Sequence, residues 1–409
     1  MNLSRRSMLR RSLAVASSSL GMPILHAQSN DSVRIGLILD MTGVYSSISG
    51  KGTATAAALA IEDFGGSVLG RKIELIVGDH QSKADLASTI AREWFDMRKV
   101  DTIQDVTGGA AALAVLNIAK EKNKVIVFSG PSADRITNDL CMPSSVHYAY
   151  DSYSLANTVA RAVVRNGGKE WFFITADYTG GHDIAKAATT AIIEEGGSVI
   201  GNIKHPLNAT DFSSWVLQAQ ASKAQVIGLA SFGNDLVNFI KSADEFGLGK
   251  SGKDTKKLAS LLMYINDVHA LGLQAAQGML LSEGFYWDMN DETRKFSRRY
   301  FERVKAMPNM SQAGTYSSTL HYLKAVKAAG TTETAAVMAK MRELPVNDFY
   351  ATGYIREDGR MVHDMYLFQV KSPDESRYPW DYFKLVSKVP GDQAFLPLAK
   401  SQCPLVKKS

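Results

Sequence analysis

The sequence predicts an α/β protein made of two lobes of the Rossmann type, each a parallel sheet covered by helices. From Val33 onward, short apolar runs of strand length alternate with longer alanine-rich segments whose apolar residues recur at helical spacing. The runs lack in-out alternation, which is typical of strands buried on both faces of a parallel sheet. The pattern restarts after Tyr150, and 409 residues are enough for two domains.

The predicted elements follow in order along the chain. The first lobe has strands at 34–39, 72–77, 100–104 and 124–129, with helices at 53–64, 84–98 and 110–121. The second lobe has strands at 170–175, 198–203 and 225–230, with helices at 154–165, 182–195, 211–221 and 235–246. A third section has a strand at 279–282, helices at 291–305, 313–329 and 332–342, and a hairpin around Gly359. We expect one helix pair of this section to return to the first lobe and the hairpin to extend the second.

The first 27 residues have the features of an export signal. Arginines, among them the pair Arg5-Arg6, precede a mildly apolar run at 13–25, no acidic residue is present, and Ala27 offers a small residue at the cleavage edge. The segment Ser4 to Arg10 resembles the twin-arginine signal of bacteria. A single anchor helix is the alternative, but Gly21 and Pro23 interrupt it. We expect export to the periplasm, cleavage near Ala27 and no stable membrane insertion, because no later stretch approaches about 20 apolar residues.

The composition of the chain limits the kinds of molecule that we expect it to bind. Apolar residues make up 45% and charged residues 21%, which is ordinary for a globular protein. The formal net charge is +5, part of it in the segment to be removed, and the other basic residues are dispersed, so nucleic acid is not an expected partner. In an oxidising compartment the two cysteines, Cys141 and Cys403, allow one disulfide, which we favour, or two free thiols.

The patterns of common enzyme classes are absent from the sequence. It has no Gly-x-Ser-x-Gly elbow and no His-Glu-x-x-His pair, and its eight histidines form no ligand spacing. Gly50-Lys51-Gly52-Thr53 lacks the spacing of a phosphate loop and is better explained as a glycine turn that opens a helix. We expect no catalytic residues, no metal and no cofactor.

Loops after the predicted strands are the best candidates for a binding site. Small polar residues precede helices at 40–52, 105–110, 129–133, 177–181 and 231–235. Ligands of open α/β sheets bind outside the carboxyl ends of strands, where helix N-termini present free N–H groups and partial positive charge to a carboxylate. Each loop could equally be an ordinary connection, but together they favour a cleft between lobes. The candidate ligand-binding residues are Tyr45, Thr107, Gly108, Gly109, Ala110, Gly130, Ser132, Ala133, Tyr178, Phe232 and Tyr286.

Several fragments resemble the type I periplasmic binding proteins of the leucine/isoleucine/valine-binding kind. The opening carries Ile35-Gly36-Leu37, Met41-Thr42-Gly43, Gly50-Lys51-Gly52, Ala60-Ile61-Glu62-Asp63 and Gly70-Arg71-Lys72-Ile73-Glu74-Leu75, and Asp211-Phe212-Ser213-Ser214-Trp215 matches further on. The resemblance runs from about residue 33 to 369.

The resemblance implies a Venus-flytrap architecture, in which two lobes joined by a hinge of three crossings close on a ligand and the closed form docks on a membrane permease. It assigns the ligand carboxylate to Thr107, Gly108, Gly109 and the loop 130–133, and aromatic contacts to Tyr178 and Phe232. We place lobe 1 at 28–148 and 279–349, lobe 2 at 149–278 and 350–390, and a C-terminal tail at 391–409.

One departure from the family bears on the ligand. Members that bind amino acids hold the ammonium group with an acid after the last strand of the second lobe, where this chain reads Leu261-Leu262-Met263-Tyr264. An unpaired ammonium would cost several kcal/mol in the cleft, unless Asp267 substitutes. The segments 284–288 and 364–367 resemble a subgroup that takes aromatic or other amine-free acids.

The resulting hypothesis is a monomeric periplasmic substrate-binding protein of an ABC transporter, not an enzyme. It would capture a small carboxylate by hinge closure, with an amine-free organic or aromatic acid favoured and a branched-chain amino acid next. The alternative is a periplasmic ligand sensor of the same fold that signals to a receptor or regulator.

Overall fold

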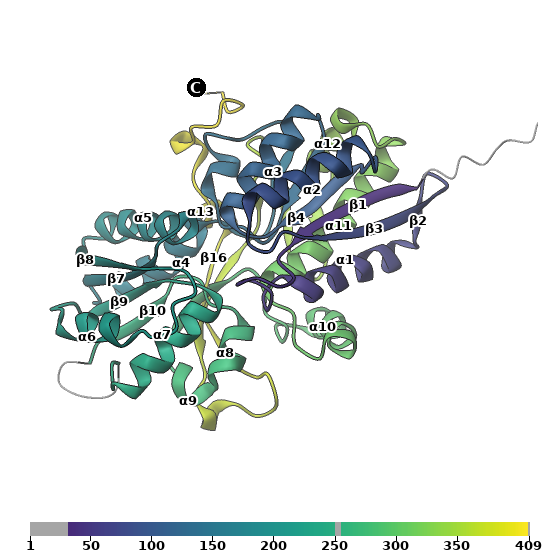
Figure 1. The fold of residues 1–409 in the computed structure, drawn as a ribbon. Helices are drawn as coiled ribbons and strands as arrows, with labels where there is room; N and C mark the ends of the chain where they lie inside the picture. The colour runs from purple at the N-terminus through teal and green to yellow at the C-terminus, as the bar shows by residue number, and fades with distance from the viewer. Residues whose placement is uncertain (1–31, 250–254, 408–409) are drawn as a thin grey trace, which may run out of the picture. The chain divides into compact units, whose positions relative to one another are not determined.

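The computed structural model describes residues 32–249 and 255–407. The predicted export signal lies outside these residues. Two sheets organise the described chain, and we call each sheet with its covering helices a lobe (Figure 1).

The first lobe contains a six-stranded sheet of order β2-β3-β1-β4-β5-β6, parallel except for the β2–β3 pair. Its central strands β1, β4 and β5 are almost wholly buried, as their continuous apolar runs predict. Helices cover both of its faces, with α2 and α3 on one and α1 and α11 on the other (Figure 1). Its strands are β1 (Val33–Leu39), β2 (Ser67–Val68), β3 (Arg71–Asp79), β4 (Thr102–Val106), β5 (Val125–Phe128) and β6 (Ser145–His147). Its helices are α1 (Gly50–Phe64), α2 (Ala84–Asp96), α3 (Gly109–Glu121), the short 3-10 helix η1 (Asp134–Thr137), α10 (Asp291–Val304), α11 (Met310–Ala329) and α12 (Thr334–Glu343).

The second lobe contains a seven-stranded sheet of order β16-β15-β11-β10-β9-β7-β8, in which β15 and β16 are antiparallel additions to a parallel sheet. The edge strand β8 alternates exposed and half-buried residues, whereas central β9 is fully buried. Its strands are β7 (Glu170–Ala176), β8 (Ser198–His205), β9 (Val226–Ala230), β10 (Lys257–Ser260), β11 (Leu280–Glu283), β15 (Met365–Val370) and β16 (Phe383–Val389). Its helices are α4 (Ser152–Arg165), α5 (Thr179–Glu194), α6 (Ser213–Ala221), α7 (Gly233–Glu245), α8 (Ile265–Leu271) and α9 (Leu273–Ala276).

Two expectations about the third section need correction. The predicted boundary at 279 comes too early, because β11 pairs with β10 and β15 and therefore belongs to the second sheet. The hairpin around Gly359 does not extend that sheet. It forms a separate three-stranded sheet from β12 (Val346–Asn347), β13 (Thr352–Ile355) and β14 (Met361–Val362), and the extension is made by β15 and β16.

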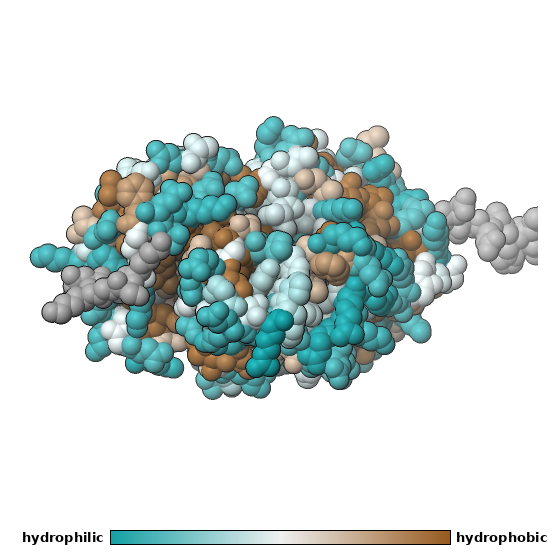
Figure 2. All heavy atoms as spheres, turned by 90° about the horizontal axis from the view of Figure 1, so that it is seen from below, coloured by the Kyte–Doolittle hydropathy of each residue, from teal (hydrophilic) through white to brown (hydrophobic). Residues whose placement is uncertain are grey.

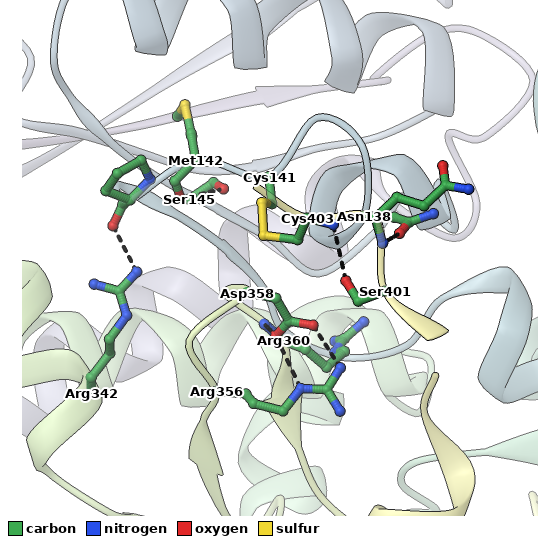
Figure 3. Close-up of a disulfide and its surroundings, with 12 residues drawn as sticks. Asn138, Cys141, Met142, Ser145, Arg342, Arg356, Asp358, Arg360, Ser401 and Cys403 are labelled. Carbon is green, nitrogen blue, oxygen red and sulfur yellow. Dashed lines mark hydrogen bonds and ion pairs between the residues drawn. A yellow bond between two sulfur atoms is a disulfide. The ribbon is translucent and has the colours of Figure 1, made fainter. Parts of the chain in front are cut away.

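The chain passes between the sheets after β6, after β11 and after β14. Beyond β15 come the 3-10 helix η2 (Pro373–Glu375), strand β16, helix α13 (Gly391–Ala394) and a last 3-10 turn, η3 (Leu398–Lys400). Cys403 is joined to Cys141 of the first lobe by a disulfide, the pairing favoured over two free thiols (Figure 3).

The surface of the described residues is mixed. Figure 2 shows hydrophilic residues spread over one face with separate hydrophobic areas between them. Within 32–249 and 255–407 no helix combines the length and the apolar character needed to cross a bilayer.

Candidate functional site

The loops at the strand ends of the two lobes line a cavity of about 30 Å³. The first lobe contributes loops after β1, β4 and β5, and the second contributes loops after β7, β9 and β10. Larger hollows occur on the second lobe, and none of these combines strand ends of both lobes. The residues that line the cavity are Tyr45, Ile48, Thr107, Gly108, Gly109, Gly130, Pro131, Ser132, Tyr150, Tyr178, Gly180, Phe232, Leu262 and Tyr264.

The buried carboxylate of Asp40 shapes the first of these loops. Its Oδ1 accepts a hydrogen bond from Gly43 N at 2.7 Å, and its Oδ2 accepts from Tyr45 N at 3.0 Å and from Ser82 Oγ at 2.5 Å. A side chain at Gly43 would place Cβ only 2.4 Å from Asp40 Oδ1. The tight turn fixes the backbone from which the Tyr45 ring reaches the cavity.

Helix α3 begins at the cavity with its N-terminal N–H groups unused. Its N-cap is Gly108, whose φ of 87° suits glycine and which provides no capping side chain. Ala112 N is the first to bond back, to Gly108 O at 2.9 Å. Within the described residues, the N–H groups of Gly109 and Ala110 have no acceptor. This end of the helix can therefore receive an anion.

The loop after β5 has its carbonyl oxygens occupied from behind. Gly130 O accepts from Tyr150 OH, Pro131 O from His147 Nε2 at 2.8 Å, and Ser132 O from both the N–H and the hydroxyl of Ser152 at 2.8 Å. Because these three consecutive carbonyl oxygens already accept hydrogen bonds, they do not compete with a ligand carboxylate for N–H donors. Pro131 has no N–H and Gly130 N is bonded to Asp105, so the N–H groups that this loop can offer beside those of α3 are the ones of Ser132 and Ala133.

A buried acid, Asp105, supports the same loop. Its Oδ1 accepts from Ser129 N at 3.1 Å and from Gly130 N at 2.8 Å, and its backbone has a φ of 81°, rare for a residue with a side chain. Burial raises the pKa of this carboxyl to about 6, against the lowering effect of the two N–H donors. Its Oδ2 has no partner among the described residues.

The wall contributed by the second lobe is aromatic. Tyr178, Phe232 and Tyr264 are the N-cap residues of α5, α7 and α8, so all three follow strand ends. The Tyr178 ring lies 5.9 Å from Phe232, edge to face, and 6.4 Å from Tyr45 of the first lobe. The geometry suits a flat or branched apolar group held between rings.

A pair of hydroxyls at the same cavity links Tyr264 of the second lobe to Tyr150 of the first crossing, which is bonded in turn to Gly130 of the first lobe. Because Tyr150 OH donates to Gly130 O, the hydrogen bond between the Tyr150 and Tyr264 hydroxyls has Tyr264 as its donor. Both side chains are buried, and burial raises the pKa of each hydroxyl. The pair is neutral and can turn towards a polar group of a ligand.

Comparison with known proteins gives a family match over most of the described chain. Residues 32–376 match the family described as periplasmic binding protein. This chain is a periplasmic binding protein. Its fold is that of the type I members, as the sequence resemblance implied.

The proteins most similar to this binding protein include other binding proteins, some of them from ABC transporters. The "Leu/Ile/Val-binding protein homolog 6" of Brucella melitensis is 24% identical over 358 residues, covering 85% of this chain and 90% of the relative. A periplasmic binding protein from Burkholderia mallei is 50% identical, with a TM-score of 0.89 over 92% of this chain and 100% of its own. A branched-chain amino acid ABC transporter ligand-binding protein from Burkholderia xenovorans is 38% identical, with a TM-score of 0.83 over 92% and 100%. A solute-binding protein of R. palustris in complex with benzoate shares the fold at 18% identity, with a TM-score of 0.81 over 92% and 100%.

Most of the predicted site residues meet in the cavity of the binding protein. Those that line it are Tyr45, Thr107, Gly108, Gly109, Gly130, Ser132, Tyr178 and Phe232. Ala110 and Ala133 do not line it, since Ala110 is exposed and Ala133 packs in the core of the first lobe. Their backbone N–H groups still belong to the two donor segments.

The prediction that Tyr286 belongs to the ligand-binding site is wrong. Although it follows β11, it lies against β15 and β16, with its ring 5.0 Å from that of Phe383. Its hydroxyl donates to Trp380 O at 3.1 Å, and it does not line the cavity. The side chain therefore supports the second lobe.

Six lining residues were not individually predicted: Ile48, Pro131, Tyr150, Gly180, Leu262 and Tyr264. Three of them, Ile48, Pro131 and Gly180, lie inside loops that the sequence had pointed to. Tyr264 lies in the segment considered only for its lack of an acid, and Tyr150 lies beyond β6 at the first crossing. Its position after a sheet strand was the signal that could have identified it.

No charged side chain and no histidine is among the fourteen lining residues. The acidic residues near Tyr264 are Asp267 and Glu283, and neither of them lines the cavity. Asp267 Oδ2 accepts from Tyr264 N at 2.9 Å, and burial raises the pKa of Asp267 to about 7. Burial, and secondly the neighbouring Asp267, raises the pKa of Glu283. In the described chain no group of three or more His, Cys, Asp or Glu residues could hold a metal.

Proposed function

We propose that this binding protein captures a small carboxylate without an α-amine, with an aromatic or branched apolar body, and delivers it to an ABC permease. The observation that carries this proposal is the lining of the cavity: two segments of backbone donors, aromatic rings, and no charged side chain. A carboxylate can be held by helix N-termini and loop N–H groups alone. An ammonium group would enter without a charged partner, at a cost of several kcal/mol.

The proposal includes closure about the hinge. The cavity of about 30 Å³ is far smaller than the pockets that hold small organic ligands, so a ligand has to enter while the lobes are further apart. Contacts such as Tyr45–Tyr178 and Tyr150–Tyr264, which link the lobes, would re-form around the ligand. Ligand binding then shifts the population towards the closed shape that a permease reads.

The remaining assignments belong to the same proposal. We take residues up to about 27 as a cleaved export signal and the protein as a periplasmic monomer that catalyses no reaction. The first lobe would comprise the segments before 148 and between β11 and about 349, with 391–409 as the tail. Recovery of the bound compound chemically unchanged after incubation would support a carrier and argue against an enzyme.

A branched-chain amino acid is the second candidate. The relative from Burkholderia xenovorans carries that name, and here Asp267 and Glu283 lie behind Tyr264. If Tyr264 turned aside, an ammonium group could reach these carboxyls. Burial raises the pKa of both carboxyls, so an ammonium group would first have to offset the cost of ionising one of them in the interior. A ligand sensor of the same fold would bind the same compounds and differ only in the partner of the closed form.

Pairs of compounds that differ only in the α-amine test the ligand class. We would measure binding by calorimetry for 4-methylpentanoate against leucine and for 3-phenylpropionate against phenylalanine, with benzoate as a compact aromatic acid. We expect the amine-free member of a pair to bind at least about tenfold more tightly, since an unpaired buried charge costs more than about 1.4 kcal/mol. Tighter binding of leucine than of 4-methylpentanoate would overturn the proposal and favour the second candidate.

A further inference from the structure

The end of the chain returns from the second lobe to the first. After β16 the chain leaves the second sheet at Val389, and Cys403 is bonded to Cys141 beside η1 of the first lobe (Figure 3). Gln402 N also donates to Asn138 Oδ1 of the first lobe at 2.6 Å. We call residues 390–403 the strap. It adds a connection between the lobes to the three crossings made by the earlier chain.

The beginning of the strap is fastened to the second lobe. Gly391 N donates to Asp364 Oδ1 at 3.1 Å, and Asn157 Nδ2 of α4 donates to Gln393 O at 2.7 Å. A side chain at Gly391 would place Cβ 2.8 Å from the backbone of His363, so this contact leaves no spare room. The strap is therefore anchored firmly at residues 391–393.

Its middle covers the third crossing. Phe395 is 1% exposed, the guanidinium carbon of Arg360 lies 4.5 Å from the centre of its ring, and the His363 ring lies 5.3 Å away. Further on, Lys400 Nζ forms an ion pair of 3.0 Å with Glu194 at the end of α5. Both of these groups are half exposed, so this last attachment to the second lobe is weak.

The length of chain between anchors sets the reach of the strap. From Lys400 to the disulfide there are three residues, which span at most about 10 Å; from Gln393 there are ten, which span at most about 35 Å. While the ion pair holds, the first lobe near Cys141 cannot move far from α5. Once it breaks, the lobes can separate until the rest of the strap is extended.

We propose that the strap, closed by the Cys141–Cys403 disulfide, limits how far the lobes open and thereby raises affinity for the ligand. It is compatible with the arrangement seen here, in which the lobes touch through Tyr45 and Tyr178, so it can exclude only more open arrangements. Removing it enlarges the open ensemble and lowers the population of the binding-competent form, which weakens apparent affinity. The inference rests on the proposed function only in requiring that the lobes separate.

A longer strap with an intact disulfide tests this without removing any contact. We would insert about six glycine and serine residues between Leu396 and Pro397, which adds about 20 Å of reach. The matched control carries the same insertion after Val406, beyond the disulfide. Small-angle X-ray scattering of the full chain without ligand should give a larger radius of gyration for the first variant and no change for the control. Cys403→Ser should behave as the first variant does, and Lys400→Ala should give a smaller increase.

Ligand binding supplies the second measurement. The apparent Kd for benzoate, or for 4-methylpentanoate if that binds more tightly, should rise by about threefold or more in the variant with the longer strap and stay unchanged in the control. Equal radii of gyration for the two insertion variants would overturn the inference. A larger radius without measurable binding of either acid would support the strap and count against the proposed ligand class.

Discussion

Replacing Asp105 by asparagine should change how stability depends on pH. In the folded protein burial raises the pKa of this carboxyl to about 6, from an ordinary value of 3.8. The folded state therefore holds this proton more tightly than the unfolded chain does. The contribution of Asp105 to the free energy of unfolding therefore falls as pH rises from about 4 to about 6, and it is level above that range. The amide of the Asp105→Asn variant does not titrate, so the variant should lack this part of the pH dependence.

The magnitude follows from the difference in proton affinity. Each tenfold change is worth about 1.4 kcal/mol, so a pKa of about 6 in place of 3.8 corresponds to about 3 kcal/mol. The amide can keep both N–H bonds to its oxygen, but its new N–H₂ group adds a cost of about 1–3 kcal/mol that is the same at every pH. The prediction thus concerns how the difference in unfolding free energy between the two proteins changes with pH. It does not concern the size of that difference at a single pH.

Urea unfolding followed by tryptophan fluorescence measures that change. The free energy of unfolding of Asp105→Asn minus that of the unaltered protein should rise by about 3 kcal/mol between about pH 4 and about pH 7.5. Other titrating groups are common to both proteins and cancel in the subtraction. A difference that stays constant over this range would show that Asp105 is not held with a raised pKa, and would refute the reasoning.

Further substitutions test the cavity and the hinge. Tyr264→Phe removes the hydroxyl that links the lobes and should weaken ligand binding by about fivefold, as calorimetry would show. Gly108→Ala forces a side chain into a φ of 87° beside an aromatic ring, and Gly70→Ala does so at 71° in open space. Both should lose about 1–2 kcal/mol in urea unfolding, and only the first should also lose affinity. Arg360→Met leaves the buried carboxylate of Asp151 without its cationic partner and should cost about 3–5 kcal/mol, whereas combining it with Asp151→Asn should recover part of that loss.

Local patterns were sufficient for most of the fold. Continuous apolar runs predicted the buried strands, because a strand covered on both faces has no polar side. β11 was assigned to the wrong lobe because it is only four residues long, and its place in the sheet depends on pairing with β15, which lies far along the chain. The hairpin was misplaced for the same reason. Strand pairing is not a local property of the sequence.

The candidate site was predictable as loops and less so as side chains. Residues directly after strands, such as Thr107, Gly130 and Tyr178, could be found because carboxyl ends of parallel strands meet at one edge. Tyr286 has the same position in its segment but lies against β16, since β11 is flanked by an antiparallel strand there. The direction of a side chain depends on neighbours that the sequence alone does not reveal.

The three carbonyls behind the loop after β5 have a mechanical consequence. Their donors, His147, Tyr150 and Ser152, all belong to the short segment at which the chain first leaves one lobe for the other. The loop after β5, which would hold the anion, is thus hydrogen-bonded to the segment that would bend when the lobes move. If the lobes rotate about this crossing, the backbone at 147–152 changes and the hydrogen bonds transmit the change to the loop 130–132. Substitutions at this crossing should therefore change the affinity for the ligand, even where the substituted side chain does not line the cavity.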